Sequence, residues 1–309
     1  YIVSLTFGLS ITGATVMLWA AMGVVLTPTA AVKEFQPPAW GVWVGAASIV
    51  LCVLGCAFWF QWISADHYYL LARISQAGPA RTAYAIKAVK QNPFNDMYRA
   101  EVGLAYQDEF MSYQNLAYQA QQQGQDPNAY VAQAQTAFKN AEQSLLDTIA
   151  FVPTEYDNYV FLSNLYNNGG QFMDTKYYND AVKWGEEGTK VEPYGPAVRY
   201  QLARALLSLN RRAEAIKHLE FAVKLDPAFE DGALTLSRVY REDGNNKDAL
   251  RVLNALKAAK PDAAGVNEAI QQIEASSTAP KQAHEPRCVG TDVAHTGRRA
   301  ATCRLLERP

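Results

Sequence analysis

Histidine and cysteine side chains are the first candidates for chemistry in this sequence, because both are common zinc ligands. They are His67, His218, His284, His295, Cys52, Cys56, Cys288 and Cys303. The four that lie in the last thirty residues have a loose spacing that resembles no zinc finger, and the chain has no phosphate-binding glycine loop, nucleophile elbow or Cys-x-x-Cys pair. We therefore predict no catalytic, cofactor-binding or metal-binding residue here, and we leave open whether a longer parent protein is an enzyme.

A second candidate is a set of polar side chains that recurs along the chain. Arg204 and Arg238 are 34 residues apart, Asn164 lies 40 residues before Arg204, and Tyr200 and Arg241 are close by. Successive guanidinium groups can hold a carboxylate or a phosphate through paired hydrogen bonds. The alternative is that these arginines are solvated or paired within the protein. We interpret the set as the candidate lining of a groove for a protein or peptide partner.

Charge is distributed unevenly over the 309 residues. The 28 Lys and Arg nearly balance the 30 Asp and Glu, for a net charge of -2, which argues against a strongly basic nucleic-acid-binding protein. Residues 1–65 contain only two charged side chains, Lys33 and Glu34, whereas the rest has an ordinary soluble composition. The sequence thus predicts an apolar segment that is joined to a water-soluble one.

Two uncharged runs, residues 1–27 and 40–64, make up the apolar segment. At about 1.5 Å per residue, each run is long enough to cross a hydrocarbon core of about 30 Å. Tryptophans, which favour the headgroup level, lie at both ends of the second run: Trp40, Trp43, Trp59 and Trp62. We predict two transmembrane helices in the lipid bilayer of a bacterial cell membrane, rather than helices buried in a large soluble core.

The first residue is Tyr1, and no basic start or cleavage site marks a signal peptide. We therefore interpret the chain as the C-terminal piece of a longer multi-pass protein, whose other transmembrane helices would pack on the small residues of these two. Basic residues after the second run favour the cytoplasmic side for the soluble part. Large domains cross membranes largely regardless of charge, so the side of the membrane stays open.

An internal repeat decides the fold of the soluble part. Pro193, Pro227 and Pro261 are 34 residues apart, and an alanine precedes each of them by twelve residues. Pro153 has an alanine at the same offset, and the longer intervals before Pro153 and Pro193 keep the phase if the extra residues lie between the two helices of a unit. These alanines are Ala141, Ala181, Ala215 and Ala249. The spacing predicts an all-α solenoid of antiparallel helix pairs over residues 65–275.

Several local features refine this prediction. The long insertion near 107–138 predicts two overlong helices, at about 95–122 and 127–151, with Asp126 as N-cap. Asn167-Asn168-Gly169-Gly170 predicts a loop, and residues 263–274 predict a final capping helix. Residues 276–309 lack periodicity and predict a disordered tail, unless they are translated out of frame.

The repeat resembles the tetratricopeptide family. One unit opens with Val102-Gly103-x-x-Tyr106, and the next opens with Leu162-Ser163-x-x-Tyr166. Small residues at the eighth and twentieth positions let two helices approach, and the proline stops the second one. No unit has the family's tryptophan at the fourth position, and Arg81 replaces the expected alanine in the first unit. The resemblance implies a groove lined by the first helix of each unit, which binds an extended peptide or a helix.

Two stretches carry a more specific resemblance. Residues 65–72 (ADHYYLLA) and 91–108 (QNPFNDMYRAEVGLAYQD) resemble the C-terminal part of bacterial O-antigen ligase/polymerase-type membrane proteins. That family transfers lipid-linked glycans with a many-span core, and its catalytic loop matches no position here. The resemblance implies the C-terminal anchor and protein-interaction region of a cell-envelope glycan-transfer protein. The alternative is a stand-alone, membrane-anchored scaffold without catalysis.

Overall fold

A computed structural model describes residues 39–278, and the chain divides into two compact units at Ser64. Over the described residues, the secondary structure consists of eleven α-helices and no strand. The all-α fold is therefore as predicted. The first thirty-eight residues, which hold the predicted span 1–27, and residues 279–309 of the predicted tail lie outside the described part.

The first described helix, α3, runs from Ala39 to Ile74. Between residues 39 and 278 it is the one helix that is long and apolar enough to cross a membrane, through a segment Ile49–Ile74 with a mean hydropathy of 1.6. Only 6 % of its most apolar stretch is buried, although a core helix of a soluble protein can be equally long and apolar. Of the two predicted transmembrane helices, the second thus has a candidate span in the structure, and the first lies outside the described residues. The helix continues past the predicted end at residue 64 because the small side chains of Ala65 and Ala72 are buried in the repeat domain.

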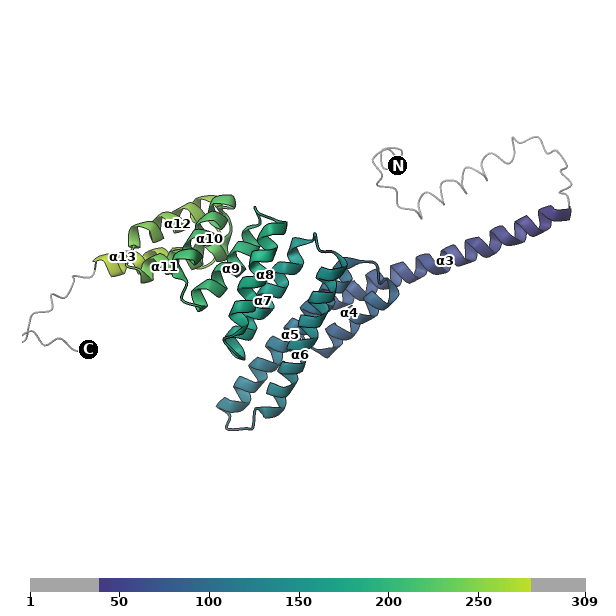
Figure 1. Cartoon of the computed structure of the whole chain (residues 1–309), viewed down its shortest axis with the longest axis horizontal. Helices are drawn as coiled ribbons and strands as arrows, with labels where there is room; N and C mark the ends of the chain where they lie inside the picture. The colour runs from purple at the N-terminus through teal and green to yellow at the C-terminus, as the bar shows by residue number, and fades with distance from the viewer. Residues whose placement is uncertain (1–38, 279–309) are drawn as a thin grey trace, which may run out of the picture. The chain divides into compact units, whose positions relative to one another are not determined.

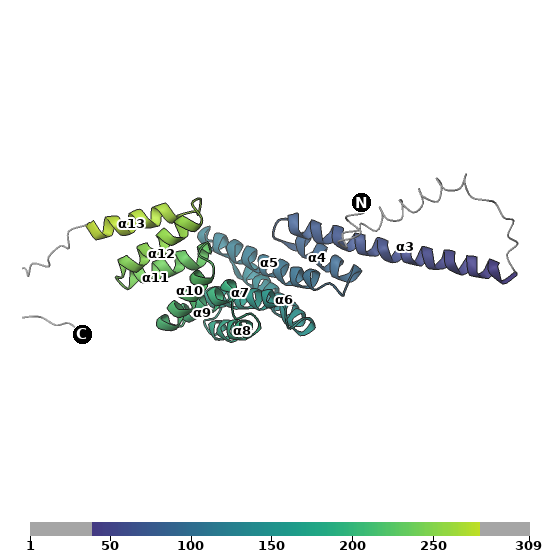
Figure 2. The same cartoon turned by 90° about the horizontal axis from the view of Figure 1, so that it is seen from above.

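The repeat domain is a series of antiparallel helix pairs (Figure 1). Residues 64–74 of α3 precede α4 (Pro79–Gln91), and α5 (Asp96–Gln122) pairs with α6 (Asn128–Phe151). The following pairs are α7 (Tyr156–Phe172) with α8 (Tyr177–Val191), α9 (Pro196–Ser208) with α10 (Arg212–Leu225), and α11 (Glu230–Glu242) with α12 (Asn246–Ala259). A last helix, α13 (Val266–Thr278), packs on α12, as Figure 2 shows from above.

Small side chains let the two helices of each pair approach each other closely. The repeated alanines are completely buried: Ala141, Ala181, Ala215 and Ala249. At the eighth position, a Cβ on Gly103 would lie 2.6 Å from the side chain of Leu145, and the Ser163 hydroxyl donates to the Ala181 carbonyl at 2.9 Å. The helix axes can approach closely only where such residues face each other. The predicted repeat phase is therefore confirmed.

The missing tryptophan at the fourth position has a polar replacement. Arg99, Tyr159 and Arg199 occupy this position in three successive units, and each donates to the carbonyl oxygen of the proline six residues before it, at 2.8, 2.9 and 3.0 Å. The guanidinium groups of Arg99 and Arg199 also lie over the rings of Phe151 and Phe221, at 4.3 and 4.1 Å. One side chain thus joins the end of a helix pair to the start of the next.

The predicted loop at Asn167–Gly170 is wrong, because all four residues belong to α7. Their turn-like composition is overridden by tertiary packing. A Cβ on Gly169 would lie 2.6 Å from the Phe138 ring, and one on Gly170 would lie 2.6 Å from the Tyr178 ring, so both rings pack against bare helix backbone. The extra residues of this unit lengthen α7 to 17 residues, compared with 13 in α9.

The insertion near 107–138 extends the α5–α6 hairpin (Figure 1). The two helices have 27 and 24 residues, and their ends lie within one residue of the predicted bounds. The rings of Phe110 and Phe138 meet edge to face at 5.4 Å between their centroids. At the tip, Gly124 turns the chain with a φ of +69°, and the Asp126 carboxylate accepts the Asn128 N–H at 2.9 Å.

Candidate functional site

Three of the predicted groove residues lie together where α7 meets α9. The Arg204 guanidinium donates from Nη1 to Asn164 Oδ1 at 2.9 Å and to Gln201 Oε1 at 3.0 Å. It also lies 5.9 Å from the centroid of the Tyr200 ring. Asn164 and Arg204 hold equivalent places in successive units, which is why they meet. Arg204 is therefore paired within the protein, as the alternative interpretation of the sequence held.

The other two predicted groove residues lie in a different place. Arg238 and Arg241 line a cleft of about 230 Å³ between α11 and α13, and Arg241 donates to Gln272 Oε1 at 3.1 Å. The side chain of Arg238 is exposed. Glu268, on α13, lies across the cleft. The structure thus divides the five predicted residues between two neighbourhoods, each with arginine as its cation.

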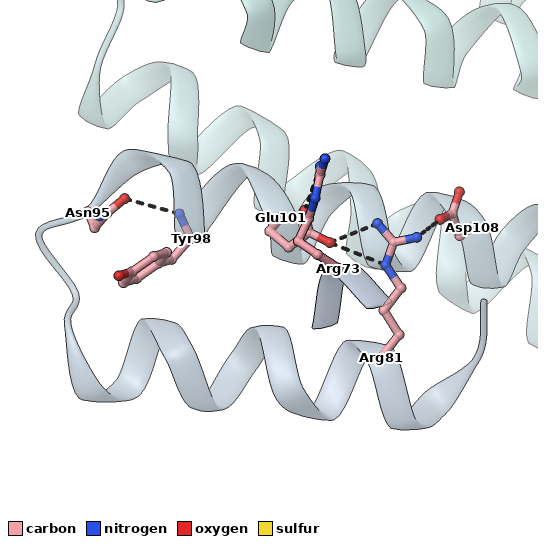
Figure 3. A network of polar contacts seen from close by, with 6 residues as sticks. All are labelled: Arg73, Arg81, Asn95, Tyr98, Glu101 and Asp108. Carbon is pink, nitrogen blue, oxygen red and sulfur yellow. Dashed lines mark hydrogen bonds and ion pairs between the residues drawn. The ribbon is translucent and has the colours of Figure 1, made fainter. Parts of the chain in front are cut away.

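A cluster of ion pairs that the sequence did not predict lies at the first helix pairs (Figure 3). Arg81 on α4 donates to Glu101 Oε1 from Nε at 3.2 Å and from Nη2 at 2.7 Å, and it also pairs with Asp108. Arg73 on α3 lies 3.6 Å from Glu101 Oε2. The Glu101 side chain is only 2 % exposed, so Arg81 compensates a buried carboxylate. The arginine in the place of the expected alanine was the available signal in the sequence.

Next to this cluster, a cleft of about 400 Å³ opens between α3, α5 and α7. Acidic side chains dominate its charged lining: Asp96, Glu101, Glu155 and Asp157, with Arg73 as the one cation among the lining residues. Asn158 also lines it, and this residue is 2 % exposed. Its Nδ2 is buried and has no hydrogen-bond partner. Buried polar groups are rarely left unpaired, so this amide marks the cleft as a place where a ligand can complete a contact.

Two hydrogen bonds from a tyrosine to a carboxylate join neighbouring helices of the repeat domain. Tyr98 donates to Asp66, and burial followed by this hydrogen bond raises the pKa of Tyr98 well above its ordinary value. Burial and the hydrogen bond to Glu220 raise the pKa of Tyr240 to about 12. Both hydroxyls therefore stay protonated and act as structural donors. Among residues 39–278, no group of three His, Cys, Asp or Glu side chains is placed to hold a metal ion, and the histidines and cysteines of the tail lie outside that range.

Part of the chain matches a known protein family. Residues 206–273 match the tetratricopeptide repeat family, and no curated protein sequence matches the chain. A solved thermophilic repeat protein of Thermus thermophilus is 15 % identical, with 71 % of this chain and 99 % of that chain covered and a TM-score of 0.48. The MamA 41-end structure from Desulfovibrio magneticus RS-1 is 13 % identical, with coverages of 65 % and 97 % and a TM-score of 0.42.

A third solved structure, YrrB, is described as a repeat protein with an unusual peptide-binding site. It is 14 % identical, with 62 % of this chain and 82 % of that chain covered and a TM-score of 0.38. The family match, together with the paired helices and their buried alanines, establishes a tetratricopeptide repeat domain in this chain. The domain is a protein-interaction scaffold of the α-solenoid class.

Proposed function

We propose that this chain is the C-terminal membrane anchor and interaction region of a bacterial O-antigen ligase/polymerase-like protein, and that its repeats hold a protein or peptide partner. The observation that carries the interaction role is the pair of open, charged clefts on the first helices of the repeats. One lies between α3, α5 and α7, and the other between α11 and α13. An extended segment can present a different charged side chain to each of the two clefts.

The anchoring role rests on α3. The part of α3 before the repeat domain, residues 39–63, has no charged side chain and is long enough to span a bilayer at about 1.5 Å per residue. It overlaps the candidate segment Ile49–Ile74, and the indole rings of Trp40, Trp43, Trp59 and Trp62 are all exposed. Extraction of membranes with alkaline carbonate tests this proposal. We expect the full chain to stay with the lipid pellet, because a spanning helix is not released by charge or pH. Release into the supernatant would contradict anchoring.

The parentage rests on the two stretches that resemble the ligase/polymerase type. These stretches pack on each other, since Tyr98 donates to Asp66 and its ring lies 5.2 Å from that of Tyr69. The coding sequence upstream of Tyr1 tests the parentage. Many further spans are expected there, and a start codon close to Tyr1 would favour the stand-alone scaffold instead.

Peptide binding by the full chain in detergent micelles tests the groove. The probe is a fluorescein-labelled octapeptide of alternating glutamate and alanine, followed by anisotropy. Replacing Arg204 and Arg238 by alanine removes one arginine from each of the two neighbourhoods. Arg238 is exposed in its cleft, whereas Arg204 already donates to Asn164. A hydrogen bond to a charged group is worth about 1.5–3 kcal/mol, so the loss of Arg238 alone should weaken binding at least tenfold. The control removes Arg211, which directly precedes α10, and Arg251 on α12; they pair locally with Glu214 and Asp248. If both double variants bound the peptide with equal affinity, Arg204 and Arg238 would be excluded as peptide-binding residues.

A further inference from the structure

We propose that the acidic cleft between α3, α5 and α7 binds a lysine or arginine residue of an extended partner segment, through its side-chain cation and its main-chain carbonyl. This inference rests on the proposed function, because it names the chemistry of the ligand at one end of the same groove. The arginines of the groove would bind an acidic residue of the partner, whereas this cleft would bind a basic one.

The first support is the charge of the cleft. Its charged lining residues are four acids and one arginine, Arg73, whose side chain is itself 55 % exposed. Arg81 occupies only Oε1 of Glu101, whereas Oε2 has the single contact with Arg73, at 3.6 Å. Glu101 is a lining residue of the cleft, and Oε2 is the more weakly held of its two carboxylate oxygens. A second cation can bind there without breaking the Arg81 pair.

The second support is independent of charge. Asn158 is 2 % exposed, lines the cleft and has an Nδ2 with no partner. An amide donor needs an acceptor, which a cation cannot supply. A residue in an extended segment carries both groups, since its main-chain carbonyl lies a few ångströms from its side-chain cation. The combination of a free amide donor and unsaturated carboxylates thus favours a peptide over a polyamine or a metal ion.

The third support is the apolar part of the lining. Met97 is 58 % exposed, and Leu104 and Phe161 also contribute to the walls. Lysine and arginine bury their aliphatic stems on such surfaces while the charged group reaches polar partners. Because the opposite end of the domain carries Arg238 and Arg241, a partner segment with one basic and one acidic residue would bind in a single direction.

The test uses the full chain in detergent micelles and three labelled octapeptides, in which alanine alternates with lysine, glutamate or serine. The variant is Glu155→Gln with Asp157→Asn, two acids at the rim of the cleft. The control is Glu186→Gln with Glu187→Gln, which changes the net charge equally on α8. We expect the lysine peptide to bind wild type more tightly than the serine peptide does. The rim variant should weaken lysine-peptide binding about tenfold, and the control less than twofold.

Two further comparisons separate this inference from the proposed function. Arg204→Ala with Arg238→Ala should weaken the glutamate peptide and leave the lysine peptide unchanged, so either arm can fail alone. Spermidine, which has cations but no carbonyl, should compete with the lysine peptide at least tenfold less well than unlabelled lysine peptide does. Any of three results would overturn the inference. The lysine peptide fails to bind wild type, it binds the rim variant and the control variant equally well, or spermidine displaces it as readily as unlabelled lysine peptide does.

Discussion

Replacing Arg81 by alanine restores the residue that the repeat pattern expects, and we nevertheless expect it to destabilise the first helix pair. The substitution removes both hydrogen bonds to Glu101 Oε1, at 3.2 and 2.7 Å, from a side chain that is 2 % exposed. Breaking a fully buried ion pair costs about 3–5 kcal/mol. Arg81 is 15 % exposed and Arg73 remains nearby, which lowers the expected loss to about 2 kcal/mol.

Hydrogen exchange in the full chain measures this loss where it occurs. A decrease of about 2 kcal/mol in the free energy of local opening corresponds to about thirtyfold faster exchange of the α4 amides, at 1.36 kcal/mol per tenfold. Amides of α11 and α12 serve as the internal control, because each repeat contacts only its neighbours. Unfolding of the whole chain is a poorer measure, since repeat domains need not unfold in one step.

A companion variant separates the lost pair from a simple loss of volume. Arg81→Ala combined with Glu101→Met removes the charge as well as its partner, and an apolar replacement of a buried ion pair is often neutral. We expect the double variant to regain most of the protection of α4. Unchanged exchange in the single variant, or a double variant as unstable as the single one, would refute the claim that Arg81 compensates a buried charge.

Three further outcomes follow from the packing and the charges. Gly188→Ala would place a Cβ 2.6 Å from Val198 Cγ2, so we expect a lower thermal midpoint by circular dichroism and a loss of about 1–3 kcal/mol. Arg199→Ala removes a donor to the Pro193 carbonyl and a contact with the Phe221 ring. We expect the free energy of local opening of α10 to fall by about 1–2 kcal/mol, measured as faster hydrogen exchange of its amides. Burial, followed by the charge of Arg199, lowers the pKa of His218 below its ordinary 6.5. The unfolded chain then binds the proton more readily, so stability is complete above pH 6.5 and declines as the pH falls below it; thermal midpoints of His218→Gln should lack this decline.

The repeat phase could be predicted because it depends on residue types with few alternatives. A buried alanine such as Ala181 or Ala215 marks where two backbones approach, and a proline twelve residues later marks where a helix must stop. The hairpin tip was also predictable, because Asp126 and Pro127 favour a helix start through local geometry. Each of these features acts within a few residues of itself in the chain or at a fixed spacing.

The remaining features depend on partners from elsewhere in the fold. Gly169 and Gly170 are typical of a turn until rings from α6 and α8 are known to pack on them. The sequence placed Arg204 near Asn164 through their common register, but it could not tell which of the arginines would be paired internally. Asn158 gave no signal at all, because a buried donor without a partner is recognisable only from its surroundings.

The turn at Gly124 offers a practical route to labelling this protein. A Cβ at this glycine would meet nothing within 4 Å, and its φ of +69° is the left-handed conformation that ends α5, where the Gln125 N–H donates to the Ala120 carbonyl at 2.8 Å. The contacts that join successive units are made near the opposite ends of the helices, where Arg99 donates to a proline carbonyl. A fluorescent domain or an epitope inserted after Gly124 would therefore leave the unit junctions intact, and it would report on the chain without occupying either charged cleft.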